Sequence, residues 1–235
     1  GIQQLIRNSS NFSPNGTVKI AGFQFNYFIS DTYINNYASS PSGSFTNLAL
    51  PALLETYDII IVPYNENPNS TVSKIIAAWL KKPHRVLFIA HDTPTVGANL
   101  LTELGTLGIW ATASGSNSSI PVASSPDNDY FYTSGPFGPV PSTTAFTGDA
   151  TWYGILKEQG DLHKLTALLS MTKNSQEYYT LAIDKNKRVV YCGESEYYIS
   201  GNLGTNGLVD NDKKRLMANI YAWAIEDVIL PGRVK

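Results

Sequence analysis

The sequence predicts an α/β fold in which a mostly parallel sheet is flanked by helices on both faces and ends in an antiparallel hairpin. Two apolar runs, Asp58–Pro63 (DIIIVP) and Arg85–His91 (RVLFIAH), are typical of strands buried on both faces. An amphipathic segment lies between them and another follows, so strands and helices alternate as in parallel sheets. Between two later strand candidates, Asp184–Lys187 is a turn-like segment that predicts a hairpin.

The first elements come before these runs. Val18–Phe25 (VKIAGFQF) predicts a first strand, and a long polar loop follows it through Ser44. Leu48–Tyr57 is a helix candidate that leads into the strand at Asp58–Pro63. The order of strand, helix and strand implies right-handed crossovers between parallel neighbours.

The helix between the two buried strands has the clearest local signal. Its apolar residues recur at i, i+3, i+4, i+7 and i+8, which places them on one helical face: Val72, Ile75, Ile76, Trp79 and Leu80. Asn69 or Ser70 can cap the helix at its N-terminus, and Lys81–Pro83 closes it.

A second helix follows the strand Arg85–His91. Thr93 offers an N-cap, and Pro94 suits the first helical position. Leu100, Leu101 and Leu104 continue this helix, which we expect Gly105 or Gly108 to stop.

The middle of the chain, residues 113–149, is rich in Pro, Gly and Ser and too rich in Pro for a central strand. Because it also carries Tyr130, Phe131, Tyr132 and Phe137, we expect it to pack as an ordered excursion from one domain that spans residues 1–235. The chain does not begin with Met, and we expect it to be a piece of a longer protein.

The last third predicts four short strands and a final helix. The strands are Thr151–Leu156, Leu165–Ser170, Tyr178–Ile183 and Arg188–Cys192. We expect Asp210 or Asn211 to cap the helix and Pro231 to end it. Its predicted inner face consists of Leu216, Met217, Ile220, Tyr221, Ala224 and Val228.

Composition excludes several classes of protein. The net charge of -2, without clustered Lys and Arg, argues against a nucleic-acid-binding protein. No apolar run approaches the roughly 20 residues that a membrane span needs. The single cysteine, Cys192, excludes an internal disulfide and a Cys-based metal cage, and it lies inside a predicted strand as a small buried apolar residue.

Ligands of open α/β sheets bind at the carboxyl ends of the strands, near the point where strand order changes. His91, Asp92 and Thr93 occupy such a strand end, just before a helix N-terminus that favours an anion. His91 could act there as a general base. The alternative, which we favour, is that Asp92 or Thr93 caps the helix and His91 makes one structural hydrogen bond.

The second strand-end candidate comprises Glu194, Ser195 and Glu196, directly after the strand Arg188–Cys192. In an extended chain the two carboxylates point to the same side, where they could serve acid–base chemistry. Together with Asp92 they could instead hold calcium or magnesium. The structural alternative is a solvated loop, preferred for Glu196 and evenly balanced for Glu194.

The C-terminal segments KNKRVVYCGESEYYISGN and NDKKRLMANIYAWAIEDVI resemble the closing motif of class I glutamine amidotransferase-like domains. The matching positions are Gly193, Glu194, Ser195, Asn219 and Trp223. YDIIIVPYNENPNSTVSKIIAAWLKKPHRVLFIAHD is similar to the second strand, helix and third strand of this superfamily. The resemblance implies a flavodoxin-like three-layer sandwich. It also implies a nucleophilic Cys after the third strand, where this chain has Ala90-His91-Asp92-Thr93 and no Cys.

The missing nucleophile favours a non-catalytic module that binds a carbohydrate or another envelope protein, without a cofactor or metal. The alternative is an unconventional hydrolase in which His91 is the base and Asp92 or Glu194 orients it. Few charges and many Asn, Ser, Thr and Tyr residues suggest a bacterial periplasm or cell surface. The single cysteine suits a cytoplasm equally well.

Overall fold

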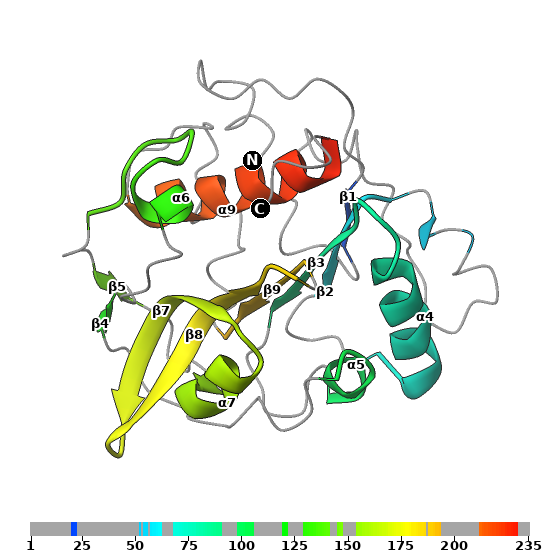
Figure 1. Ribbon diagram of the computed structural model, residues 1–235, viewed down its shortest axis with the longest axis horizontal. Helices are drawn as coiled ribbons and strands as arrows, with labels where there is room; N and C mark the ends of the chain where they lie inside the picture. Colours follow the sequence, from blue (N-terminus) through cyan, green and yellow to red (C-terminus); the bar gives the residue numbers. More distant parts are fainter. Residues whose placement is uncertain are drawn as a thin grey trace.

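The structure, a computed structural model, describes a mixed sheet with helices packed against it (Figure 1). The described residues are 20–22, 52, 54–55, 57–62, 68–90, 98–105, 119–121, 129–141, 145–147, 154–186, 188–193 and 212–229. Among them, no helix combines the length and the apolar character needed to cross a membrane.

Within the described part of the chain the main sheet has seven strands, of which four neighbours run parallel in the order β1-β2-β3-β9. These four strands are β1 (Ile20–Gly22), β2 (Ile59–Val62), β3 (Val86–Ala90) and β9 (Val189–Cys192). The order confirms the predicted parallel half, and every residue of β2 and β9 is buried, as the continuous apolar runs require.

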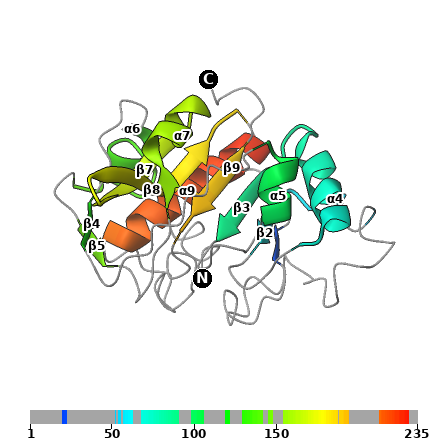
Figure 2. The same ribbon diagram turned by 90° about the horizontal axis from the view of Figure 1, so that it is seen from below.

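The other half of the sheet is antiparallel and curls away from the parallel strands (Figure 1). It contains β6 (Ile155–Leu156), β7 (Thr166–Lys173) and β8 (Gln176–Asp184). The pairing of β8 with β9 confirms the predicted hairpin, and Figure 2 shows β9 between β3 and β8. The sheet is therefore mixed, with a larger antiparallel part than the sequence predicts.

Helices lie on both faces of the parallel strands (Figures 1 and 2). On one face, α4 (Ser70–Leu80) and α5 (Ala98–Glu103) share a buried apolar cluster with β2, β3 and β9. On the opposite face, α9 (Asp212–Ile229) contacts β3 through Tyr221, whose ring stacks on Phe88 with 4.8 Å between centroids. The face of α9 that packs inward includes every predicted residue up to Ala224.

The ends of the helices follow the predicted signals where they are described. Asn69 caps α4, because its side chain accepts a hydrogen bond from the Val72 N–H at 3.0 Å, and Lys81 follows the last turn. Gly105 ends the segment after α5 with a φ of 72°, a conformation that favours glycine. The predicted caps at Thr93 and at Asp210 or Asn211 lie outside the described residues, as do most of Leu48–Tyr57 and the end at Pro231.

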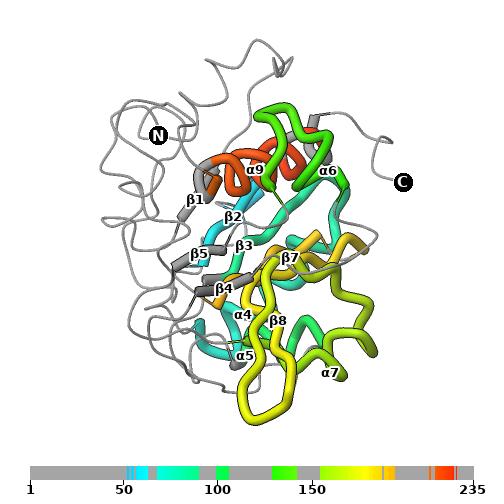
Figure 3. The backbone as a smooth tube through the Cα atoms, turned by 90° about the vertical axis from the view of Figure 1, so that its left-hand side faces the viewer, coloured from blue at the N-terminus to red at the C-terminus, as the bar shows by residue number. Residues whose placement is uncertain are grey.

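The described parts of residues 113–149 pack against the rest of the fold. They form β4 (Ser119–Pro121), α6 (Asp129–Tyr132) and β5 (Ala145–Thr147), with β4 and β5 in a separate two-stranded sheet. Helix α6 lies against α9 (Figure 3), and Phe131 is fully buried there. Among these described parts, Phe131 and Tyr132 are buried against other elements of the fold.

A short helix, α7 (Lys157–Leu162), follows β6 and packs against β8. His163 comes directly after its last turn. Gly160 permits this packing, because a Cβ atom at that position would come within 3.0 Å of the Tyr179 ring. A short polar helix with a central glycine lacks the periodicity that sequence reasoning needs.

Candidate functional site

The carboxyl ends of β3 and β9 lie side by side at one edge of the sheet. The two strands are parallel neighbours, and Ala90 pairs with Cys192 in their register. The predicted site residues His91, Asp92 and Thr93 follow the first strand end, and Glu194, Ser195 and Glu196 follow Gly193 after the second. All six lie outside the described residues, so the structure places the strand ends from which they continue and not their side chains.

The next described helices after these two neighbouring strands lie on opposite faces of the sheet. After β3 the chain reaches α5, which packs with α4 through Leu100 and Leu101. After β9 it reaches α9 on the other face. Diverging connections from adjacent parallel strands form the crevice in which open α/β sheets bind ligands. The two strand ends that the predicted segments follow therefore lie at the same edge of the sheet, which we call the carboxyl edge.

A third strand contributes Thr180 to the carboxyl edge. Beside the pair Cys192 and Leu181, the Gly193 N–H donates a hydrogen bond of 2.7 Å to the Thr180 carbonyl. Thr180 occupies a bulge of β8, because Tyr179 pairs with Ser170 while Leu181 pairs with Leu169. Bulges are frequent beside active sites, where they redirect side chains.

The Thr180 hydroxyl is an unusual group for this position. Thr180 is 1% exposed, and its Oγ1 has no hydrogen-bond partner among the described residues. A buried hydroxyl without a partner costs free energy and calls for an explanation. Sequence reasoning missed Thr180, whose only signal is a single threonine within the run YYTLAI.

Buried side chains lie next to the carboxyl edge at the end of β9. Cys192 is fully buried, in agreement with its predicted role as a small apolar residue. Tyr221 is buried against Phe88, and this burial, reinforced by the neighbouring Cys192, raises the pKa of its hydroxyl above the ordinary value. Tyr221 therefore stays neutral at physiological pH and acts as part of the core.

Asn219 and Trp223, the two α9 positions of the amidotransferase-like motif, contact the excursion. The Asn219 Nδ2 donates to the carbonyls of Phe131 at 2.9 Å and Gly138 at 3.1 Å, and its Oδ1 accepts from the Phe137 N–H at 3.0 Å. Trp223 meets the Phe131 ring edge-on, with 6.2 Å between centroids. Both positions therefore have a packing role in the described structure.

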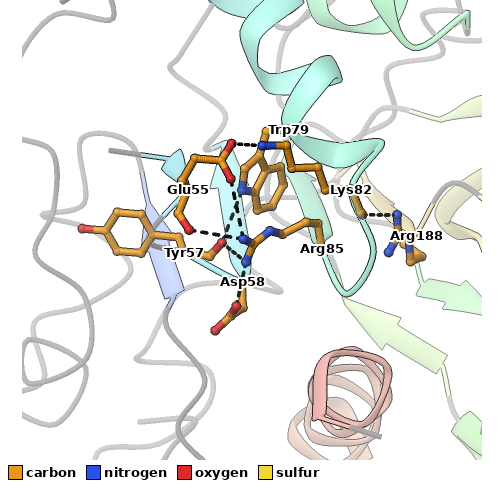
Figure 4. Close-up of polar contacts among 7 residues, drawn as sticks. All are labelled: Glu55, Tyr57, Asp58, Trp79, Lys82, Arg85 and Arg188. Carbon is orange, nitrogen blue, oxygen red and sulfur yellow. Dashed lines mark hydrogen bonds and ion pairs between the residues drawn. The ribbon is translucent and has the colours of Figure 1, made fainter. Parts of the chain in front are cut away.

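A second polar cluster lies at the opposite, amino edge of the parallel strands (Figure 4). Arg85 donates to the Tyr57 carbonyl at 2.5 Å and to Asp58 at 2.7 Å, and its guanidinium lies 5.8 Å from the Trp79 ring centroid. The Trp79 indole donates to the same carbonyl at 3.3 Å. These contacts join α4 and the start of β3 to the segment that leads into β2.

The histidines with described positions do not reach the carboxyl edge. His84 immediately precedes the segment that enters β3, at the amino edge, with a φ of 58°. His163 follows α7. Within the described residues, no group of three or more His, Cys, Asp or Glu side chains is placed to hold a metal ion.

No protein-family model matches the chain, and no curated protein matches it.

Proposed function

We propose that this chain is a non-catalytic, amidotransferase-like domain of a longer bacterial envelope protein, located in the periplasm or at the cell surface. Its carboxyl edge binds a carbohydrate or another envelope protein. The supporting observation is the pairing of Ala90 with Cys192, together with the position of the next described helices, α5 and α9, on opposite faces of the sheet. This arrangement suits the flavodoxin-like sandwich that the resemblance implies.

The position of the single cysteine supports a binding role over amidotransferase chemistry. That chemistry needs a thiolate that is accessible after β3. Cys192 instead lies in β9 and is fully buried, where a thiol is unreactive. The residues that follow β3, His91-Asp92-Thr93, supply polar and charged groups for recognition without a thiol.

Binding measurements on matched variants test this proposal. Soluble bacterial polysaccharide fragments and purified envelope proteins would be titrated into the full chain by calorimetry. We expect His91→Ala with Glu194→Gln to weaken binding about tenfold or more. The control pair, His163→Ala with Glu158→Gln on and beside α7, should bind within about twofold of the original chain. Equal loss in both pairs, or no binding of any probe, would contradict the proposal.

The alternative function is a hydrolase with His91 as general base and Asp92 or Glu194 as its orienting group. It is favoured by the adjacent ends of β3 and β9, because a base and its partner must come within hydrogen-bond reach. Turnover of a small ester, amide or glycoside that disappears in His91→Ala and persists in His163→Ala would establish this alternative and refute the non-catalytic role.

A further inference from the structure

The solvent-facing side of α4 carries a concentration of positive charge. We define the basic face of α4 by the exposed residues Lys74, Ala78, Lys81 and Lys82 and the half-buried Ile75. Residues 68–90 contain no Asp or Glu, although the whole chain has a net charge of -2. This local excess of cations therefore departs from the overall composition.

Two hollows flank the basic face. The first, of about 280 Å³, has an apolar floor of Ala77, Leu80 and Leu104 and a rim of Lys81, Glu103 and Arg188. The second, of about 330 Å³, has a floor of Ile75, Ala78 and Trp79 and a rim of Lys74, Lys82 and Glu55. Each hollow thus combines an apolar floor with two cations and one carboxylate.

Most of the positive charge at these rims is not neutralised. Lys82 forms an ion pair with Glu55 at 2.5 Å, and the Arg188 guanidinium donates a hydrogen bond of 2.7 Å to the Lys82 carbonyl (Figure 4). Arg188 also donates to the Leu80 carbonyl at 2.8 Å, and neither of these bonds neutralises its charge. Lys74 and Lys81 form no ion pair with any described residue. Carboxylates of a bound partner would form ion pairs with these cations, and apolar side chains of the same partner would fill the floors of the two hollows.

We propose that the basic face of α4 docks an acidic, amphipathic segment of a partner protein. Apolar side chains of that segment enter the two hollows while its carboxylates meet Lys74 and Lys81. Ala78, which lies between the lysines on the exposed side, is small enough to let a partner backbone approach closely. This surface lies on α4 and is separate from the carboxyl edge, so the proposal does not depend on the ligand proposed above.

The test uses a synthetic helical peptide of about 18 residues, with Leu at helical spacing and Glu at the flanking positions. Its affinity for the full chain would be measured by fluorescence anisotropy at several salt concentrations. We expect Lys74→Glu with Lys81→Glu to raise Kd about tenfold or more, and added salt to weaken binding of the original chain. The control pair Lys164→Glu with Lys173→Glu, which makes the same charge change away from α4, should change Kd by less than about twofold.

Several results would overturn the proposal. One is failure of the peptide to bind, and another is equal weakening by both variant pairs. A matched peptide with Gln in place of Glu that binds equally well would show that charge complementarity plays no part. Tighter binding of a single-stranded oligonucleotide or of anionic lipid vesicles would assign the face to another class of partner. Self-association of the chain through this face, measured by light scattering, would assign it to a second copy.

Discussion

Asn219 shows how one buried amide can organise a distant segment of the chain. Asn219 is fully buried, and its side chain satisfies one N–H and two carbonyls of residues 131–138. We expect Asn219→Ala to lower the free energy of unfolding by about 2–4 kcal/mol, because it leaves these groups unpaired and creates a cavity. Urea denaturation measures the loss. The exposed Asn186→Ala should stay within about 0.5 kcal/mol, and an equally small effect at Asn219 would refute this role.

Gly135 gives a second prediction about the same contact. A Cβ atom at Gly135 would lie within 3.0 Å of the Asn219 side chain, which three hydrogen bonds hold in place. Gly135→Ala should therefore destabilise the original chain by about 1–3 kcal/mol through overpacking. In an Asn219→Ala background the same substitution should cost much less, because the clashing atoms are gone. A double-mutant cycle measures this coupling, and additive effects would contradict the close approach.

At the carboxyl edge, the buried Thr180 hydroxyl without a hydrogen-bond partner among the described residues should lower the stability of the folded protein. Replacing Thr180 by Val preserves its shape and removes the unpartnered hydroxyl, so we expect the melting temperature to rise by roughly 2–4 °C. Thr166→Val, at the other end of the β7–β8 pairing, is the matched control and should bring no such rise. A lower melting temperature for Thr180→Val would show that the hydroxyl is satisfied in the folded protein.

At the scale of the element, α4 depends on contacts at both of its ends. Asn69 caps the first turn, and at the other end Arg188 donates hydrogen bonds to the carbonyls of Leu80 and Lys82. We expect Asn69→Ala to cost about 1 kcal/mol, while Asn69→Ser keeps an oxygen acceptor and costs little. Thermal unfolding followed by circular dichroism compares the two variants. Equal stability of both would mean that the cap contributes nothing.

The elements that sequence reasoning found are those with a strong period or a continuous apolar run. Helix α4 has five apolar residues on one face, and β2 and β3 lie within long apolar stretches, so their type and order could be predicted. Strands β7 and β8, which pair as a further hairpin, extend beyond the predicted strands Leu165–Ser170 and Tyr178–Ile183 because the end of this hairpin is polar. Its turn residues Asn174 and Ser175 both have positive φ, and serine gives little sequence signal for such a turn.

The candidate site was predictable only in part, for a reason that belongs to the whole molecule. Strand-end residues such as His91 and Glu194 can be found from local pattern, because each follows an apolar run. That their strands are neighbours depends on the pairing of Ala90 with Cys192, and these two residues are separated in sequence by all of residues 113–149 and by the antiparallel strands β6, β7 and β8. Thr180 also lies at the carboxyl edge, in a bulge of β8, and a bulge produces no periodic pattern in the sequence.

Four tyrosines in different parts of the fold determine how the stability of the whole molecule should depend on pH. Burial is the main cause that raises the pKa of Tyr130, Tyr132, Tyr179 and Tyr221 above the ordinary value of about 10. The charge of Glu226 adds to the shift of Tyr130, and a hydrogen bond to Asp161 adds to that of Tyr179. In the unfolded chain all four would ionise at their ordinary pKa, while the folded protein keeps their hydroxyls protonated.

The contribution of these tyrosines to stability should therefore be constant below about pH 10 and fall as the pH rises above it, because the unfolded state then loses protons that the folded state retains. Each such tyrosine contributes a slope of about 1.4 kcal/mol per pH unit until its own folded-state pKa is reached. Urea denaturation between about pH 8 and pH 11, with tyrosinate absorbance recorded in parallel, measures both quantities. Tyr221→Phe should reduce the slope by one such contribution, since phenylalanine preserves the stacking on Phe88 and has no proton to lose. If all the tyrosines ionised near pH 10 in the folded protein, these side chains would be solvated, and the prediction would be wrong. The interface between α6, α9 and the sheet would then be less tightly packed than the burial of these rings indicates.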